Sequence, residues 1–281
     1  MSAVARPPSS SAKLYRARQS RTQLLRHLSQ AAIVVFIVTA SVIHNLATMD
    51  GTTASIDALC PFGGLETLWQ WIVSGGSFVP KTHLSNLILA AGLGLSVLVA
   101  GGAFCGWICP FGALQDALAW VRVRLRLPEI QVPARLDGIL RYGRYVVLAL
   151  ILYKTATTVT LMFADVDPYR TIFSLDWWFA FNPAEQWPAY VAAGVVLVAS
   201  LGIERVWCRY LCPLGGAISL LGNLSLLRIR RSADTCKSCS LCERPCPVKI
   251  NVAKAKTVSS NCIGCLACVQ ACPRHDTLDV Q

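Results

Sequence analysis

Residues 236–247 read CKSCSLCERPCP, and residues 262–273 read CIGCLACVQACP. In each stretch two residues separate the first three cysteines, three residues separate the third from a fourth, and a proline follows. A cubane iron–sulfur cluster needs four thiolates, and a short turning loop supplies three of them from one stretch. The doubled spacing therefore predicts two [4Fe-4S] clusters in a small α+β domain over residues 232–281.

The fourth ligand of each cluster is predicted to come from the other stretch, because this crossing is the rule in two-cluster ferredoxins. The set named cluster 1 here is Cys236, Cys239, Cys242 and Cys272. The set named cluster 2 is Cys246, Cys262, Cys265 and Cys268. Disulfides would require an oxidising compartment, and zinc sites usually take two C-x2-C pairs, so both alternatives are weaker.

Upstream of this domain, a second cysteine motif occurs twice. Residues 105–112 read CGWICPFG and residues 208–215 read CRYLCPLG, each at the end of a long apolar run and each followed by a basic cluster. This C-x3-C-P repeat predicts two pseudo-repeated halves, related by an axis along the membrane normal. A third echo at residues 60–64, CPFGG, lacks the first cysteine.

The motif cysteines are spaced four residues apart, which stacks two sulfurs on one face if the helix continues. They are Cys105, Cys109, Cys208 and Cys212. Four converging thiolates suit iron, zinc or Cu(I), so a third metal or iron–sulfur centre is predicted here. The alternative is that all four are reduced packing thiols. Cys60 is expected to face outward alone, as a packing thiol.

The composition is that of a membrane protein: 54% of the residues are hydrophobic and 15% are charged, against about 25% charged in ordinary domains. Four apolar runs, at 30–47, 83–104, 143–163 and 189–206, each approach the ~20 residues that span a bilayer. Residues 65–73 are too short to span and fit an interfacial helix. We therefore expect an all-α bundle of four transmembrane helices over residues 29–231.

The net charge of +11 is unevenly distributed. Basic residues concentrate in the tail at 1–28 and in the segment 105–142, whereas the other two connections are acidic. The positive-inside rule predicts a multi-pass protein of the cytoplasmic membrane with both termini and the 232–281 domain in the cytoplasm. No basic stripe with its own fold suggests a nucleic-acid partner.

Three ionisable residues are candidates for a quinone site. Lys154 falls inside the third apolar run, where an ionisable group is a functional candidate by default. His44 and His83 lie near the outer ends of the first two runs and could take protons from a quinol. Structural pairing of Lys154 and interfacial hydrogen bonding of the two histidines are the alternatives.

The two C-x3-C-P motifs and the doubled cluster motif together resemble the membrane-bound polyferredoxins of the NapH, NosR and CcoG type. The resemblance runs from about residue 28 onward and is closest to the NapH-type membrane subunit of quinol dehydrogenases. It implies a subunit that passes electrons from the quinone pool to an iron–sulfur or cytochrome partner in a respiratory complex. Two alternatives stay open: a CcoG-like copper reductase or oxidase-assembly factor, and a membrane redox sensor.

Overall fold

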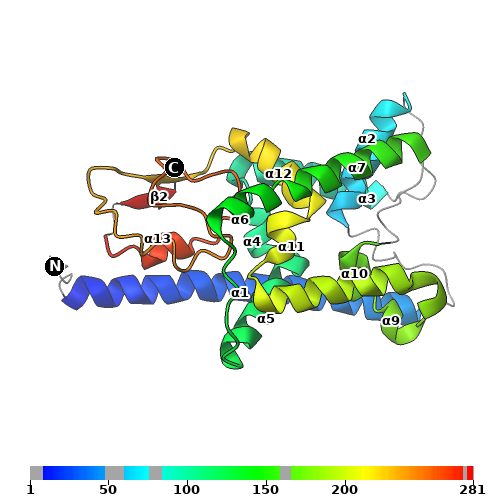
Figure 1. Cartoon of the computed structure of the whole chain (residues 1–281), viewed down its shortest axis with the longest axis horizontal. Coiled ribbons are helices and arrows are strands. Elements are labelled where there is room, and N and C mark those ends of the chain that lie inside the picture. The colour runs from blue at the N-terminus through cyan, green and yellow to red at the C-terminus, as the bar shows by residue number, and fades with distance from the viewer. Residues whose placement is uncertain (1–8, 48–59, 76–83, 159–165, 275–276, 281) are drawn as a thin grey trace.

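The computed structural model describes residues 9–47, 60–75, 84–158, 166–274 and 277–280. The chain is mostly helical, with the C-terminal cysteine-rich segment at one end of the molecule (Figure 1). In chain order the elements are α1 (Ser9–Leu46), α2 (Pro61–Val73), α3 (Leu84–Ala100), α4 (Ala103–Trp107), α5 (Pro110–Arg124), α6 (Ala134–Leu140), α7 (Gly143–Thr158), α8 (Pro168–Phe173), α9 (Asp176–Phe179), α10 (Pro183–Gly202), α11 (Val206–Tyr210), α12 (Pro213–Leu221), the 3-10 turn η3 (Gly222–Leu224), β1 (Ile229–Arg231), α13 (Ala267–Ala271) and β2 (Leu278–Val280).

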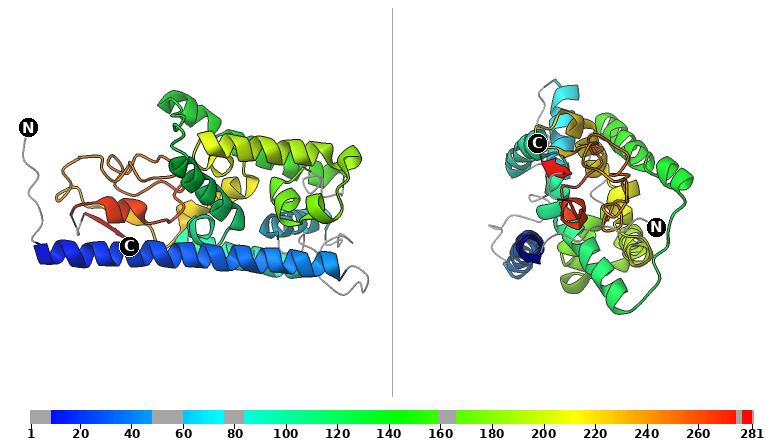
Figure 2. Two further views of the ribbon diagram at one scale, coloured as in Figure 1. Left: turned by 90° about the horizontal axis from the view of Figure 1, so that it is seen from below. Right: turned by 90° about the vertical axis from the view of Figure 1, so that its left-hand side faces the viewer.

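Helix α1 runs along the whole molecule, past both the cysteine-rich segment and the other long helices (Figure 2). It begins at Ser9, so the helix includes much of the predicted tail as well as the first predicted span. Within the described residues, Arg21–Leu46 is the one stretch long and apolar enough to cross a membrane. Helices α3 and α7 have 17 and 16 residues, so the four-helix transmembrane bundle stays a prediction.

The cysteine repeat is also a repeat of structure. In each half a long helix breaks, a five-residue helix follows, and a third helix begins at the proline of the motif: α3–α4–α5 and α10–α11–α12. The breaks use left-handed backbone at Gly101 (φ 58°) and Arg205 (φ 51°). The two cysteines of a motif therefore do not share one continuous helix.

The two halves pack into two apolar clusters. Helix α2 lies along α3 and α7, and α12 packs on α7, around buried Phe62, Val97 and Leu148. On the other side α10, α5, α1 and α8 pack around Phe111 and Val196. Burial of such side chains contributes roughly 1.5–3 kcal/mol each. Cys105 and Cys212 contact the first cluster and Cys109 contacts the second, which places these cysteines where the halves meet.

The cysteine-rich segment is built largely of loops around its own apolar core. Strands β1 and β2 pair antiparallel, with Ile229 opposite Val280 and Arg231 opposite Leu278. Four of its cysteines belong to the buried core: Cys246, Cys265, Cys268 and Cys272. The short pair of strands with one helix agrees with the expected α+β segment at the C-terminal end.

Candidate electron-transfer site

The prolines of the two C-x3-C-P motifs determine the local backbone. Cys109 and Cys212 are the N-caps of α5 and α12, with extended backbone at ψ 118° and 113°. A proline disfavours helical backbone at the residue before it, so the chain must turn at each of these cysteines. Cys105 and Cys208 lie just upstream, on the short helices α4 and α11.

The four motif cysteines converge from the two halves. All four line one small cavity of about 50 Å³, together with Cys262 of the cysteine-rich segment. Electrostatic interactions link Cys105 with Cys109 and Cys208, and Cys212 with the other three. Residues about 100 positions apart in the sequence are thus brought to one point between the halves.

Gln115 holds the second motif in place. Its side chain on α5 is only 1% exposed. Its Nε2 donates to Cys208 Sγ at 3.0 Å, and its Oε1 accepts from the Trp207 backbone N–H at 3.2 Å. Sequence reasoning missed this residue, because nothing in the motif indicates that a helix from one half reaches the cysteine of the other.

A buried ion cluster lies directly beside the motif cysteines. Arg205 is fully buried; its Nε and one terminal nitrogen donate to Asp116 at 2.7 and 2.6 Å, and the other donates to the Cys105 carbonyl at 2.9 Å. Arg26 also contacts Asp116, and its Nε donates to the Gly106 carbonyl at 2.9 Å. Burial opposes the charge of Asp116, but Arg205 and Arg26 outweigh burial and lower its pKa.

Seven of the eight cysteines of the C-terminal segment interact within the sets predicted for the two clusters, whereas Cys236 interacts with Arg231 and Ser238. Burial raises the pKa of Cys262 to about 12, and neighbouring Cys265 and Cys246 act in the same direction. Cys268 interacts with the same three thiols. In the other group, Cys242 interacts with Cys239 and with Cys272 from the second stretch. The crossing of the fourth cysteine is therefore present in the geometry, and ligation itself stays a prediction.

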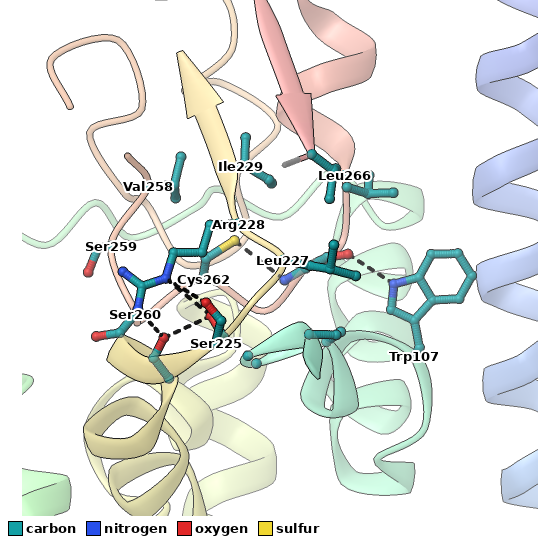
Figure 3. A pocket seen from close by; sticks show the side chains of 17 residues that line it. Trp107, Ser225, Leu227, Arg228, Ile229, Val258, Ser259, Ser260, Cys262 and Leu266 are labelled. Atoms are coloured by element: carbon teal, nitrogen blue, oxygen red, sulfur yellow. Dashed lines mark hydrogen bonds between the residues drawn. The ribbon is translucent and has the colours of Figure 1, made fainter. Parts of the chain in front are cut away.

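The cluster 2 loop docks against the first motif without space between the backbones. A Cβ on Gly102 would lie 2.2 Å from the Cys262 carbonyl, and one on Gly106 would lie 2.2 Å from the Ile263 carbonyl. Trp107 extends from α4 toward this loop, and its Nε1 donates to the Gly264 carbonyl at 2.9 Å (Figure 3). A 190 Å³ cavity borders this joint.

Two further contacts, from Gln23 of α1 and from Arg141, hold the cysteine-rich segment. Gln23 of α1 donates to the Cys265 carbonyl at 3.0 Å. Arg141 donates to the Val248 carbonyl at 2.6 Å and pairs with Asp137, which also accepts from Tyr210 beside the second motif at 2.6 Å. Both motifs and α1 therefore hold the cluster 2 side of the segment, whereas Cys239 on the cluster 1 side is exposed.

The donor sets suit iron–sulfur clusters. Each predicted set contains four cysteines, and in the cluster 2 set backbone N–H groups donate to sulfur, from Gly264 to Cys262 at 3.4 Å and from Ile250 to Cys246 at 3.5 Å. Such hydrogen bonds to the ligand sulfurs help to set cluster potentials. Among the described residues, no three His, Cys, Asp or Glu side chains are arranged as a site for a single metal ion.

A larger apolar cavity lies on the other side of the motif cysteines. It has a volume of about 340 Å³ and is lined mainly by side chains of α1, α3 and the starts of α2, α5 and α12. Cys109 and Cys212 line it, so these two cysteines border both cavities. Asp167 and Tyr169 are the principal polar side chains in its wall.

Cys60 lines the same apolar cavity, together with Cys109 and Cys212. The expectation that Cys60 stands alone is therefore wrong. It caps α2 as the other two cap α5 and α12, with extended backbone and a proline following. The sequence echo at residues 60–64 was the signal that could have placed it here.

The two predicted quinone candidates that the structure describes do not line this cavity. His44 lies on α1 and Lys154 lies exposed on α7, and neither lines the cavity. His83 lies outside the described residues. Glu66 of α2, which sequence reasoning missed, is 2% exposed, accepts from Thr155 Oγ1 at 3.1 Å and interacts electrostatically with Asp167.

Comparison with known proteins assigns both cysteine-rich regions to iron–sulfur families. A family model described as a 4Fe-4S binding domain matches residues 82–128 and again 186–232, and a 4Fe-4S dicluster domain matches residues 228–273. The first model covers each C-x3-C-P half with its preceding helix. No solved structure matches the chain.

Relatives are similar in sequence over most of this chain. YccM of Escherichia coli (strain K12) is 31% identical over 79% of this chain and 62% of its own length. Protein NirI of Paracoccus denitrificans is 34% identical over 78% of this chain, which spans only 31% of NirI. The ferredoxin-type protein NapH of Haemophilus influenzae is 30% identical over 68% of this chain and 67% of its own length. The chain therefore contains 4Fe-4S binding domains and belongs to the NapH/NosR-type polyferredoxin family.

Proposed function

We propose that the chain is a membrane subunit that takes electrons from quinol and delivers them to a respiratory partner on the cytoplasmic side. One observation carries this proposal: Cys109 and Cys212 border the large apolar cavity on one side and, on the other, the small cavity that reaches Cys262. An apolar substrate site, a set of four thiols and the cluster 2 loop thus follow one another through the molecule.

The large cavity suits a lipid-soluble quinone. Its 340 Å³ falls within the usual range of small-molecule sites, about 300–1,000 Å³, and its wall is almost entirely apolar. Phe36 and Ile88 form part of that wall and are 58% and 67% exposed, which gives the cavity an apolar mouth. A mouth of this kind would open toward lipid if the long helices cross the bilayer, as the apolar runs predict.

Three centres would connect this cavity to the partner. The motif cysteines would hold the first, and the cluster 2 and cluster 1 sets would hold the others. An iron–sulfur cluster of this type exchanges one electron at a time. The chain's contribution is to hold the thiols together: Gln115 positions Cys208, and Arg205 fixes the backbone at Cys105.

The exposed end of the path indicates where a partner would bind. Cys239 is exposed and Cys236 is half-buried, whereas the cluster 2 cysteines Cys246, Cys265 and Cys268 are buried. Electrons would therefore leave by way of cluster 1, toward an iron–sulfur or cytochrome subunit.

A metal count with a quinol assay tests the proposal. The protein is purified without oxygen, and iron, sulfide, copper and zinc are counted in the wild type and in the variant with all four motif cysteines changed to Ser. We expect about twelve irons in the wild type and about eight in the variant, at four per cluster. Reduced decylubiquinone should bleach the cluster absorbance of the wild type only.

Other outcomes would change the assignment. Copper at the motif cysteines, lost in the variant, would favour the copper-reductase alternative, because four thiolates also suit Cu(I). Equal iron in both proteins would remove the third centre. Clusters that accept electrons from dithionite but never from quinol would contradict the quinol dehydrogenase role.

A further inference from the structure

Asp167 is the carboxyl group in the wall of the apolar cavity. It precedes α8, and its Oδ1 accepts from the Tyr169 backbone N–H at 2.9 Å as a helix cap. The residue is 6% exposed, and its position beside Cys60 is indicated by the electrostatic interaction between the two side chains. A carboxylate is thus held against an apolar cavity that also contains two motif cysteines.

Glu66 stands behind Asp167 on a different element. It lies on α2, is 2% exposed and interacts with Asp167 and with Cys60. Burial raises the pKa of Glu66 to about 7, against the hydrogen bond from Thr155, while the charge of Asp167 acts in the same direction as burial. A carboxyl that titrates near neutral pH can both accept and release a proton under working conditions.

We propose that Asp167 is the residue that accepts the protons of quinol in the apolar cavity, and that Glu66 receives them from Asp167. The assignment rests on the proposed quinol oxidation and names the groups that this site uses. Two of the three candidates from the sequence do not supply this function in the geometry, since neither His44 nor Lys154 lines the cavity.

The reaction balances as a two-electron, two-proton oxidation. Each O–H bond of the quinol breaks; the first proton passes to the Asp167 carboxylate and on to Glu66, and the second is then held by the re-ionised Asp167 until Glu66 releases the first to water. The two electrons would be taken up one each by the clusters that the cluster 1 and cluster 2 cysteines would hold. Quinone leaves by the apolar mouth, and no further oxidant is needed for this half-reaction.

The test uses Asp167→Asn and Glu66→Gln in the full-length protein. Both changes keep an oxygen that accepts the existing hydrogen bond, from Tyr169 N–H or from Thr155, so the local fold is retained. Asp176→Asn and Glu185→Gln are matched controls, because they make the same chemical changes at positions on α9 and α10 that do not line the cavity. Cluster bleaching by reduced decylubiquinone is followed by stopped flow from pH 5.5 to 8.5, and iron content and dithionite reduction are measured beside it.

Asp167→Asn should slow quinol-driven bleaching by about 100-fold, the usual scale of a lost general base, with iron content and dithionite reduction unchanged. The wild-type rate should rise with pH through about 7, because only the ionised Glu66 accepts a proton. Glu66→Gln should remove that rise. Asp167→Glu should restore part of the rate.

Two results would overturn the inference, and they can be told apart from failure of the proposed function. If Asp167→Asn reacts with quinol as fast as Asp176→Asn, Asp167 is not the acceptor, although quinol oxidation stands. If the pH profile is the same in Glu66→Gln and wild type, Glu66 has no part in the relay. If dithionite reduces the wild-type clusters and quinol does not, the quinol site itself is wrong.

Discussion

Arg205 shows how a single residue supports the thiol site. Its guanidinium is 0% exposed and is held between the Asp116 carboxylate and the Cys105 carbonyl. Removing one partner of a buried ion pair leaves an uncompensated charge and costs about 3–5 kcal/mol. The charge cluster is therefore expected to hold the two halves together at the motif cysteines.

Arg205→Gln should accordingly lower the melting temperature strongly, because Asp116 loses its bidentate partner while Arg26 remains. A loss of about 3–5 kcal/mol in stability should lower the melting temperature by several degrees, by an amount that depends on the length of the protein. The measurement is a thermal melt in detergent followed by tryptophan fluorescence. Arg230→Gln, on the exposed face of β1, is the control. Equal melting temperatures for the two variants would contradict the structural role of Arg205.

Individual residues also show what the sequence could predict. The spacing alone predicted the two sets of four cysteines in the C-terminal segment, because the motif repeats locally, and seven of the eight interact within those sets. Gln115, Arg205 and Glu66 were not predictable, since their partners lie about 90 or more residues away in the chain, or on another helix. Cys60 was noticed as an echo of the motif, but its neighbours depend on how α2 packs against α3 and α7.

At the scale of elements, the docking of the cluster 2 loop on α4 depends on glycine. Gly106→Ala would place a Cβ 2.2 Å from the Ile263 carbonyl, so one backbone must move. We expect quinol-driven reduction of the clusters to fall at least about tenfold, because electron transfer is lost when carriers separate, while dithionite reduction stays intact. Stopped-flow bleaching with each reductant measures the two rates.

Gly138→Ala on α6 is the matched control, because nothing lies within 4 Å of the added Cβ. The larger side chain in Gly106→Val should have a greater effect than Ala. A Gly106→Ala protein that bleaches with quinol at the wild-type rate would show that close docking is not required.

The helices before the two C-x3-C-P motifs end in breaks that the sequence analysis did not predict. The apolar runs marked the long helices, and hydrophobicity could not indicate that they would break before the motifs. In the first half the pair Gly101–Gly102 could have indicated the break, since Gly101 takes φ 58°. In the second half the left-handed residue is Arg205, whose conformation is held by contacts with the other half. Such a break depends on tertiary structure and leaves no local signal.

At the scale of the whole molecule, the proposed electron path begins at the apolar cavity and passes the small cavity between the motif cysteines. It ends in the cysteine-rich segment at the exposed Cys239. Helix α1 runs alongside this entire path and contacts the segment through Gln23 (Figure 2). The sequence predicted the cysteine-rich end of the proposed path but not the apolar cavity, and the structure adds that Cys109 and Cys212 border both cavities.

The close docking of the cluster 2 loop on α4 determines the kinetic order expected for reduction of cluster 2. A carrier domain on a loose tether must diffuse to its donor, and such encounters between charged surfaces respond to ionic strength. Here the segment is held by backbone contact at Gly102 and Gly106 and by Trp107. Reduction of cluster 2 from the motif cysteines should therefore be first order, with a rate independent of protein concentration and of salt. Only delivery from cluster 1 to a separate partner would then be bimolecular.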